Sequence, residues 1–153
     1  CKDRPNFIGN RLFSYAGQVM LNEALAGGYS VEEVDALTGS LIGRPNTASF
    51  RLLDQVGVDV MYYVASNLYK AIPDDESREV YQDNDLLQRM VAAGKLGKKA
   101  GQGFYQETKQ GGKREFWPLN LATLEYEAPR GTPEVDAFIK AANRHKALPE
   151  RLR

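Results

Sequence analysis

Residues 5–28 read PNFIGNRLFSYAGQVMLNEALAGG, and this stretch decides the fold class of the chain. Pro5 is a natural first-turn residue, and the pair Gly27-Gly28 supplies a stop. The apolar residues between them recur at spacings that cover most of a helix surface: Phe7, Ile8, Leu12, Phe13, Tyr15, Ala16, Val19, Met20 and Leu21. We therefore predict a helix from about Pro5 to Ala26 that is central and largely buried.

One polar stripe interrupts this apolar surface. Asn10, Ser14 and Gln18 follow one another at four-residue steps, with Arg11 beside them. Polar groups on a buried helix must face something polar, and a carboxamide such as that of Asn10 both donates and accepts hydrogen bonds. The pattern leaves two interpretations of Asn10 open, a satisfied buried amide and a functional contact.

Further helical patterns follow before Gly94. Ser30 and Glu33 form a capping-box pattern that opens a helix closing near Gly39. The other predicted segments are a short loop at 41–45, a helix from Thr47 to Gly57, a helix from Val58 to Leu68, an acidic loop at 73–85, and a helix around Leu86–Val91. The third and fourth helices suggest an antiparallel pair. Five helices predict an all-α bundle.

The last third of the chain has a different pattern. Residues 103–105 and 114–117 flank a turn with Gly111-Gly112, which predicts a small β-hairpin. Thr132, Pro133 and Glu134 give an N-cap, a first-turn proline and a first-turn acid for a last helix, and residues 148–153 resemble a linker. We divide the chain into a compact unit, 2–105, and an extension, 106–153.

Composition excludes several classes of partner. The 153 residues are 42% hydrophobic and carry 20 Lys+Arg against 20 Asp+Glu, so no global field attracts nucleic acid or an anionic membrane. No apolar run approaches the roughly 20 residues that span a bilayer. A single cysteine excludes an internal disulfide framework and suits a reducing cytoplasm. Because the chain begins with Cys1 rather than Met, we expect it to be part of a longer product.

The sequence offers little for a cofactor. It has neither a G-x-G-x-x-G turn nor alternating strands and helices around one, so we expect no NAD site in this chain, and no His/Cys cluster has metal-ligand spacing. The only histidine, His145, lies between Arg144 and Lys146, as an exposed histidine does. The loop 94–103, GKLGKKAGQG, mixes glycine and lysine as phosphate cradles do, but no strand precedes it. A helix-terminating loop is favoured over an anion site there.

Two carboxylates, Asp54 and Asp59, lie near a predicted helix junction. Asp59 suits the first turn of the fourth helix, where a negative charge is favourable. Capping is the interpretation that we adopt for both.

Several blocks together resemble one enzyme family. Residues 2–12, KDRPNFIGNRL, resemble the segment K-D-x-P-G-F-I-x-N-R that opens the C-terminal domain of 3-hydroxyacyl-CoA dehydrogenases. The other blocks that match in order and spacing are Gly28-Tyr29 with Val34-Asp35, Ile42–Pro45, Phe50–Asp54, Val56–Asp59 and Gly94–Tyr105. The resemblance covers residues 2–105.

The resemblance implies a helical bundle like that of 6-phosphogluconate and 3-hydroxyacyl-CoA dehydrogenases. Such a domain packs on an NAD-binding Rossmann domain, closes over an acyl-CoA of fatty acid β-oxidation, and provides a dimer contact or pairs with a second helical copy. The family's catalytic His-Glu pair would lie upstream of Cys1, so the chain alone should be inactive. Asn10 corresponds to the Asn of F-I-x-N-R, which hydrogen-bonds around the substrate oxygen and the catalytic His. Arg11 and Ser14 are further candidates for substrate contact.

This sequence departs from the family pattern at two places. Asn6 replaces the usual Gly, and residues 46–49, NTAS, replace a common P-x-G-P. These variants and the tail are most similar to bacterial fusion proteins in which the dehydrogenase is followed by a second helical copy and an enoyl-CoA hydratase domain. Two alternatives stay open: the helical domain of a related hydroxy-acid dehydrogenase, and a non-catalytic helical interaction module.

Overall fold

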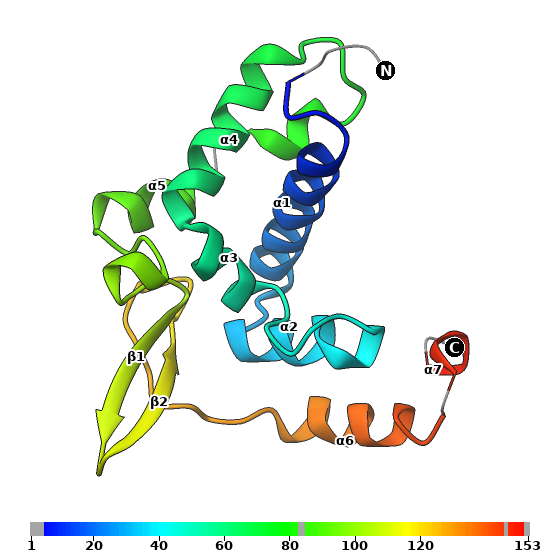
Figure 1. Ribbon diagram of the computed structural model, residues 1–153, viewed down its shortest axis with the longest axis vertical. Coiled ribbons are helices and arrows are strands. Elements are labelled where there is room, and N and C mark those ends of the chain that lie inside the picture. Colours follow the sequence, from blue (N-terminus) through cyan, green and yellow to red (C-terminus); the bar gives the residue numbers. More distant parts are fainter. Residues whose placement is uncertain (1–4, 83–84, 146, 152–153) are drawn as a thin grey trace.

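The computed structural model describes residues 5–82, 85–145 and 147–151. The chain is mainly helical, with one small hairpin and a helix after it, as predicted (Figure 1). Its elements, in chain order, are α1 (Gly9–Gly27), α2 (Val31–Thr38), η1 (Ser40–Ile42), α3 (Phe50–Val56), α4 (Val58–Ala71), η2 (Arg78–Tyr81), α5 (Asp85–Ala92), η3 (Lys98–Ala100), β1 (Tyr105–Gln110), β2 (Lys113–Pro118), α6 (Pro133–Ala142) and α7 (Leu148–Arg151).

Helix α1 begins later and is more exposed than the sequence predicted. It starts at Gly9 rather than Pro5, because Asn6 and Phe7 have left-handed backbone angles, φ 65° and 51°, that a right-handed helix cannot contain. The prediction of a largely buried helix is wrong. The buried residues of α1 are Gln18, Leu21 and Ala24, whereas Ile8 and Leu12, at the start of the helix, are 64% and 65% exposed.

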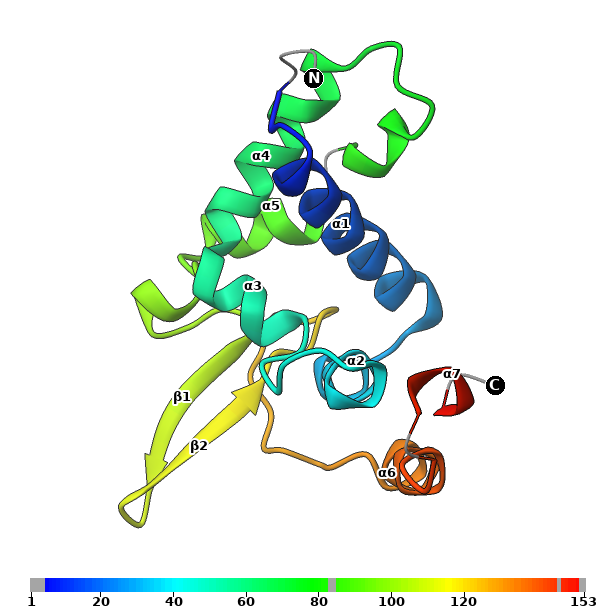
Figure 2. The same cartoon turned by 45° about the vertical axis from the view of Figure 1, so that its right-hand side comes forward.

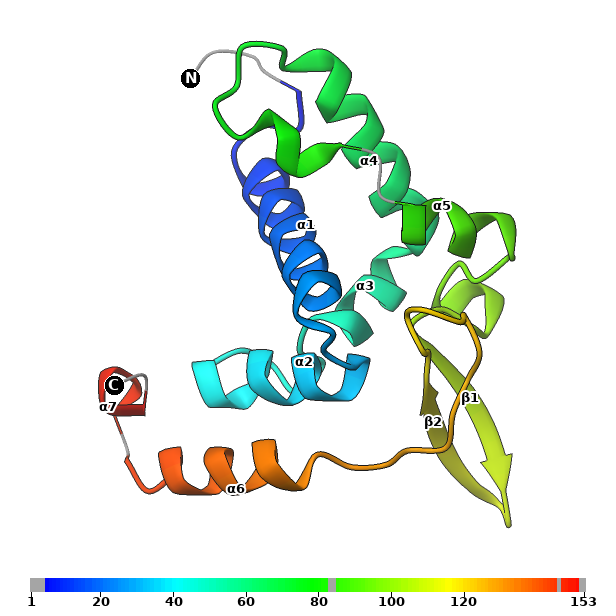
Figure 3. The same cartoon turned by 180° about the vertical axis from the view of Figure 1, so that it is seen from behind.

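Helices α3 and α4 do not form the predicted antiparallel pair. Gly57 alone separates them, with φ 109° and ψ 128°, and one residue cannot reverse the chain. Helix α4 instead continues away from the end of α3 (Figure 1) and runs opposite to α1, as the view from behind also shows (Figure 3). The resulting frame has α1 and α4 as its two long members, bridged by the segment that carries η2.

Three segments predicted as loop or linker contain helical turns. The helical turn η1 overlaps the start of the 41–45 loop and buries Leu41. The 73–85 loop contains η2, which buries Tyr81 beside Leu68 and Ile72. The predicted linker at 148–153 is helical over α7, while residues 152–153 lie outside the described residues. Leu148 of α7 packs over Gly43, at the end of η1. In each case one apolar side chain gives the short turn a place to pack.

The main core joins helices α1 to α5 to the start of the hairpin. Ser30 and Glu33 make the predicted capping box, which fixes the start of α2. The rings of Phe50 and Phe104 contact each other at a tilt of 42°, with their centroids 4.5 Å apart. The buried members of this core are Leu21, Ala24, Val31, Val34, Phe50, Leu53, Val58, Met61, Leu86, Leu87, Met90, Phe104 and Leu119.

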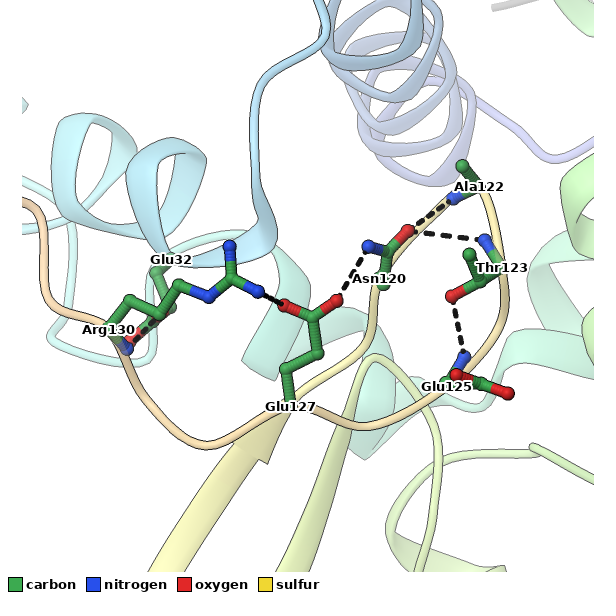
Figure 4. A network of polar contacts seen from close by, with 7 residues as sticks. All are labelled: Glu32, Asn120, Ala122, Thr123, Glu125, Glu127 and Arg130. Atoms are coloured by element: carbon green, nitrogen blue, oxygen red, sulfur yellow. Dashed lines mark hydrogen bonds and ion pairs between the residues drawn. The ribbon is translucent and has the colours of Figure 1, made fainter.

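The extension after residue 105 folds back on the helices. Strands β1 and β2 pair antiparallel around Gly111-Gly112, which confirms the predicted hairpin. The following loop is fixed by polar contacts (Figure 4): Asn120 donates to Glu127 at 2.8 Å, Glu127 pairs with Arg130 at 2.5 Å, and the Arg130 amide donates to Glu32 of α2 at 3.2 Å. Helix α6 then lies alongside α2 (Figure 2).

The start of α6 differs in one detail from the prediction. Thr132 stands at the N-cap position, but its hydroxyl makes no capping hydrogen bond to the backbone. It lies 3.2 Å from the Asp136 carboxylate, to which it donates instead. Pro133 and Glu134 occupy the first turn as predicted.

Candidate functional site

The polar residues that the sequence singles out lie on the first turns of α1. Asn10 is exposed, Ser14 is half-buried, and Gln18, two turns further on, is only 1% exposed. Four-residue steps keep the three side chains on one side of the helix. The described residues thus leave the carboxamide of Asn10 open to a ligand or to another domain.

Arg11 has a different environment. Its guanidinium pairs with the carboxylate of Asp75, and its carbonyl oxygen accepts a hydrogen bond from the Tyr81 hydroxyl at 3.4 Å. The ring of Tyr81 also meets that of Tyr15 edge to face, with centroids 6.5 Å apart. Arg11 therefore connects the segment after α4, residues 75–81, to the start of α1.

A groove runs beside these contacts. Its apolar part comes from the start of α1, where Phe7, Ile8 and Leu12 are 72%, 64% and 65% exposed. Its polar part comes from the segment after α4 and is formed by Asp75, Glu76 and Ser77. Large apolar side chains with such exposure, rimmed by polar groups, are typical of interaction and ligand-binding surfaces.

Asp35 fixes the start of α3, a role that sequence reasoning missed. Its carboxylate accepts from the backbone amides of Ser49, Phe50 and Arg51, at 3.0, 2.6 and 3.2 Å. Burial raises the pKa of the Asp35 carboxyl, although these donors oppose the shift. Asp35 thus caps α3 from α2. The contacts span 14 to 16 residues, so no local pattern could have revealed them.

Asp54 does not cap a helix, so that prediction is wrong. Its carboxylate accepts from the amides of Phe104 and Tyr105 at 2.8 and 2.9 Å, and burial raises its pKa to about 6. Gly97 and Gly103 lie so close to Asp54 that a Cβ on either would collide with it. Gly97 and Gly103 therefore leave the room that Asp54 occupies, which supports the structural interpretation of this loop.

Asp59 is confirmed in the first turn of α4. Both of its carboxylate oxygens lie 2.6 Å from Nζ of Lys99. This contact lowers the pKa of the Asp59 carboxyl and holds the loop 94–103 to α4. Lys99 is thus committed to an internal carboxylate rather than to an external anion.

The remaining polar groups that the structure describes do not assemble a cofactor site. His145 is exposed as expected, with Nδ1 3.9 Å from a Glu150 oxygen. Within the described ranges there is no group of three or more His, Cys, Asp or Glu that could hold a metal. The two strands described are antiparallel, so these residues do not fit a dinucleotide, which needs a strand, a glycine-rich turn and a helix. None of the described helices has the length and apolar character to span a membrane.

Comparison with known proteins identifies the family. Residues 7–107 match the family described as 3-hydroxyacyl-CoA dehydrogenase, C-terminal domain. The chain belongs to this family. A Bacillus subtilis protein named as a probable 3-hydroxyacyl-CoA dehydrogenase is 46% identical over 125 residues, which are 82% of this chain and 15% of that protein. A Rickettsia prowazekii protein named as a putative fatty acid oxidation complex trifunctional enzyme is 30% identical over 82% of this chain and 18% of its own length.

Solved structures of 3-hydroxyacyl-CoA dehydrogenases share this fold. The (S)-3-hydroxybutyryl-CoA dehydrogenase PaaH1 from Ralstonia eutropha is 31% identical, with a TM-score of 0.61 over 71% of this chain and 36% of that chain. FadB2 of M. tuberculosis is 34% identical, with a TM-score of 0.59 over the same shares. The chain therefore spans between 15% and 36% of these relatives' lengths. A 3-hydroxyacyl-CoA dehydrogenase of this kind is an oxidoreductase built from more than the part described.

Proposed function

We propose that this chain is the substrate-side domain of an NAD-dependent 3-hydroxyacyl-CoA dehydrogenase of fatty acid β-oxidation. It closes over the acyl-CoA together with a Rossmann domain encoded upstream, which would hold NAD and the catalytic His-Glu pair. The division at residues 2–105 and 106–153 is part of the proposal. By itself the chain should be inactive, since it supplies neither the base nor the cofactor site.

The observation that carries this proposal is the position of Asn10. It is exposed on the first turn of α1, beside the exposed residues Phe7, Ile8 and Leu12, in a chain of this family. A carboxamide there can donate to the oxygen of a 3-ketoacyl group, where negative charge develops when the ketone is reduced. Such an oriented donor is worth about 3 kcal/mol of transition-state stabilisation. Ser14 lies one turn below and Arg11 beside it, and both are proposed to border the substrate.

Two further features fit a multidomain parent. The exposed apolar side chains on α1, and Val60 and Tyr63 on α4, suit a dimer contact or pairing with a second helical copy. The long relatives, one of them named as trifunctional, suit a fusion with an enoyl-CoA hydratase domain.

The net charge of zero and the single cysteine suit a cytoplasmic protein with no nucleic-acid or membrane partner.

The test is NADH oxidation by the intact parent protein with acetoacetyl-CoA. Asn10→Ala should lower kcat by about 100-fold, the equivalent of about 3 kcal/mol. Asn67→Ala, an exposed Asn on α4, is the matched control and should leave kcat unchanged. A higher KM with kcat intact would contradict the role given to Asn10. A wild-type protein that binds NAD but does not use acetoacetyl-CoA would favour a related dehydrogenase of free hydroxy acids.

A further inference from the structure

The polar stripe of α1 ends on a buried side chain that has no hydrogen-bond partner in the described part of the chain. Gln18 is 1% exposed, and neither its Nε2 nor its Oε1 meets a hydrogen-bonding group among the described residues. An unpaired buried amide costs free energy, and native proteins rarely keep one unless a function or an ordered water accounts for it. Methionine has a similar shape and would fill the same position without that cost. The presence of a buried amide at Gln18 therefore calls for a functional explanation.

The polar stripe provides this explanation, because the exposure of its residues decreases from one to the next along the helix. Asn10 is exposed, Ser14 is half-buried and Gln18 is buried, and the four-residue spacing places each above the next on one side of α1. Ser14 stands between Asn10 and Gln18 in this spacing, and its hydroxyl can both donate and accept a hydrogen bond. The three residues make a line of polar groups that leads from the surface into the interior.

The proposed role of Asn10 needs such a line. Only Nδ2 of its carboxamide donates, so the side chain must present that end, and not Oδ1, to a substrate oxygen. Across the described ranges, no hydrogen bond fixes the Asn10 side chain, and the neighbouring Arg11 is turned to Asp75. A catalytic donor has to be held close to its productive geometry by groups behind it.

We propose that Gln18 is a positioning residue that fixes the orientation of the Asn10 carboxamide through Ser14 and an ordered water. Gln18 itself touches no substrate. This inference rests on the function proposed for Asn10. On this inference the buried amide lowers the stability of the fold and is kept because it serves the activity of the parent enzyme.

The test is Gln18→Met in the complete parent protein, with NADH and acetoacetyl-CoA. We expect kcat to fall on the order of tenfold, KM to stay unchanged, and the thermal midpoint to stay the same or rise. In the Asn10→Ala background the same change should cause no further loss, because the effect acts through Asn10. Ser14→Ala, which removes the middle group, should also lower kcat and not add to Asn10→Ala. Gln55→Met, the same exchange at an exposed position of α3, is the control and should change nothing.

Several results would overturn the inference. A Gln18→Met protein with a lower thermal midpoint and unchanged kcat would make Gln18 a structural residue. An equal fold-loss of kcat with and without Asn10 would show that Gln18 does not act through it. If Gln18→Met does not fold, Ser14→Ala decides, and its full activity would count against the proposal. An inactive wild type would overturn the proposed function, and this inference with it, whereas an active wild type with unaffected variants would overturn this inference alone.

Discussion

At the scale of single residues, Asn6 and Asp54 show how the family's sequence blocks correspond to geometry. Asn6 replaces the Gly that is usual at its position, and its φ of 65° lies in the left-handed region, which Gly adopts freely and Asn tolerates better than most residues. The substitution therefore keeps the turn that precedes α1. Gly97 and Gly103 are glycines for a different reason, since a side chain at either would collide with Asp54.

Asp54 makes the stability of the chain depend on pH. Burial raises its pKa to about 6, against 3.8 in the unfolded chain, so the folded state binds a proton more tightly. The ionised carboxyl is thus a destabilising contribution above pH 6, and it is relieved as the pH falls from about 6 to about 4. The full difference corresponds to about 3 kcal/mol.

The measurement is urea unfolding of the chain and of Asp54→Asn at several pH values between 7 and 4.5. The amide introduced by this substitution does not titrate, so we expect the unfolding free energy of the wild type, minus that of the variant, to increase by about 2 kcal/mol as the pH falls over this range. The other carboxyl groups are common to both proteins and largely cancel. A difference that shrinks toward low pH would mean that the amides of Phe104 and Tyr105 outweigh the effect of burial.

At the scale of elements, α3 depends on a cap supplied by another helix. Asp35 of α2 accepts from three amides at the start of α3, whereas Ser49, at the N-cap position, makes no side-chain capping bond. Asp35→Ala should therefore lower the unfolding free energy by about 2 kcal/mol, near the upper end for a lost cap. Urea unfolding at pH 7 measures this, with Asp74→Ala, an exposed carboxylate, as the matched control. Equal unfolding free energies of the two variants would show that Asp35 does not stabilise α3 as a cap.

The elements also separate what the sequence could predict from what it could not. The start of α2 at Ser30, the end of α3 at Gly57 and the start of α6 at Pro133 follow from local capping and breaking residues. The course of α4 after Gly57 depends on which helices cover it, and no local pattern states this. The same holds for Asp35, whose partners lie 14 to 16 residues away.

The candidate site divides in the same way. Asn10 could be proposed as a candidate from its stripe and from the family resemblance, because both depend on sequence positions close together. The exposure of α1 could not, because its apolar pattern is that of a buried helix. The pattern is compatible with burial by a part of the protein beyond this chain, which spans 15% to 36% of the lengths of its relatives.

At the scale of the whole molecule, the uncovered start of α1 should make the isolated chain self-associate. Burying one large apolar side chain in an interface contributes about 1.5–3 kcal/mol, and three residues of α1 and the turn before it, Phe7, Ile8 and Leu12, are each more than half exposed. A second copy of the chain is one partner that can cover this surface in solution. We expect the sedimentation coefficient of the isolated chain to rise with concentration.

Leu12→Glu tests this expectation, since it places a charge in the middle of the exposed stretch without touching the core. The association constant should fall by at least about tenfold, the equivalent of about 1.4 kcal/mol, and the thermal midpoint of the monomer should hardly change. Phe138→Glu, on the exposed side of α6, makes the same kind of change on another element and should leave the association intact. If both variants weaken it equally, the contact is not specific to α1. If the wild type is monomeric at every concentration, the exposed residues of α1 are not sufficient to hold two copies together and require the surface of a different domain.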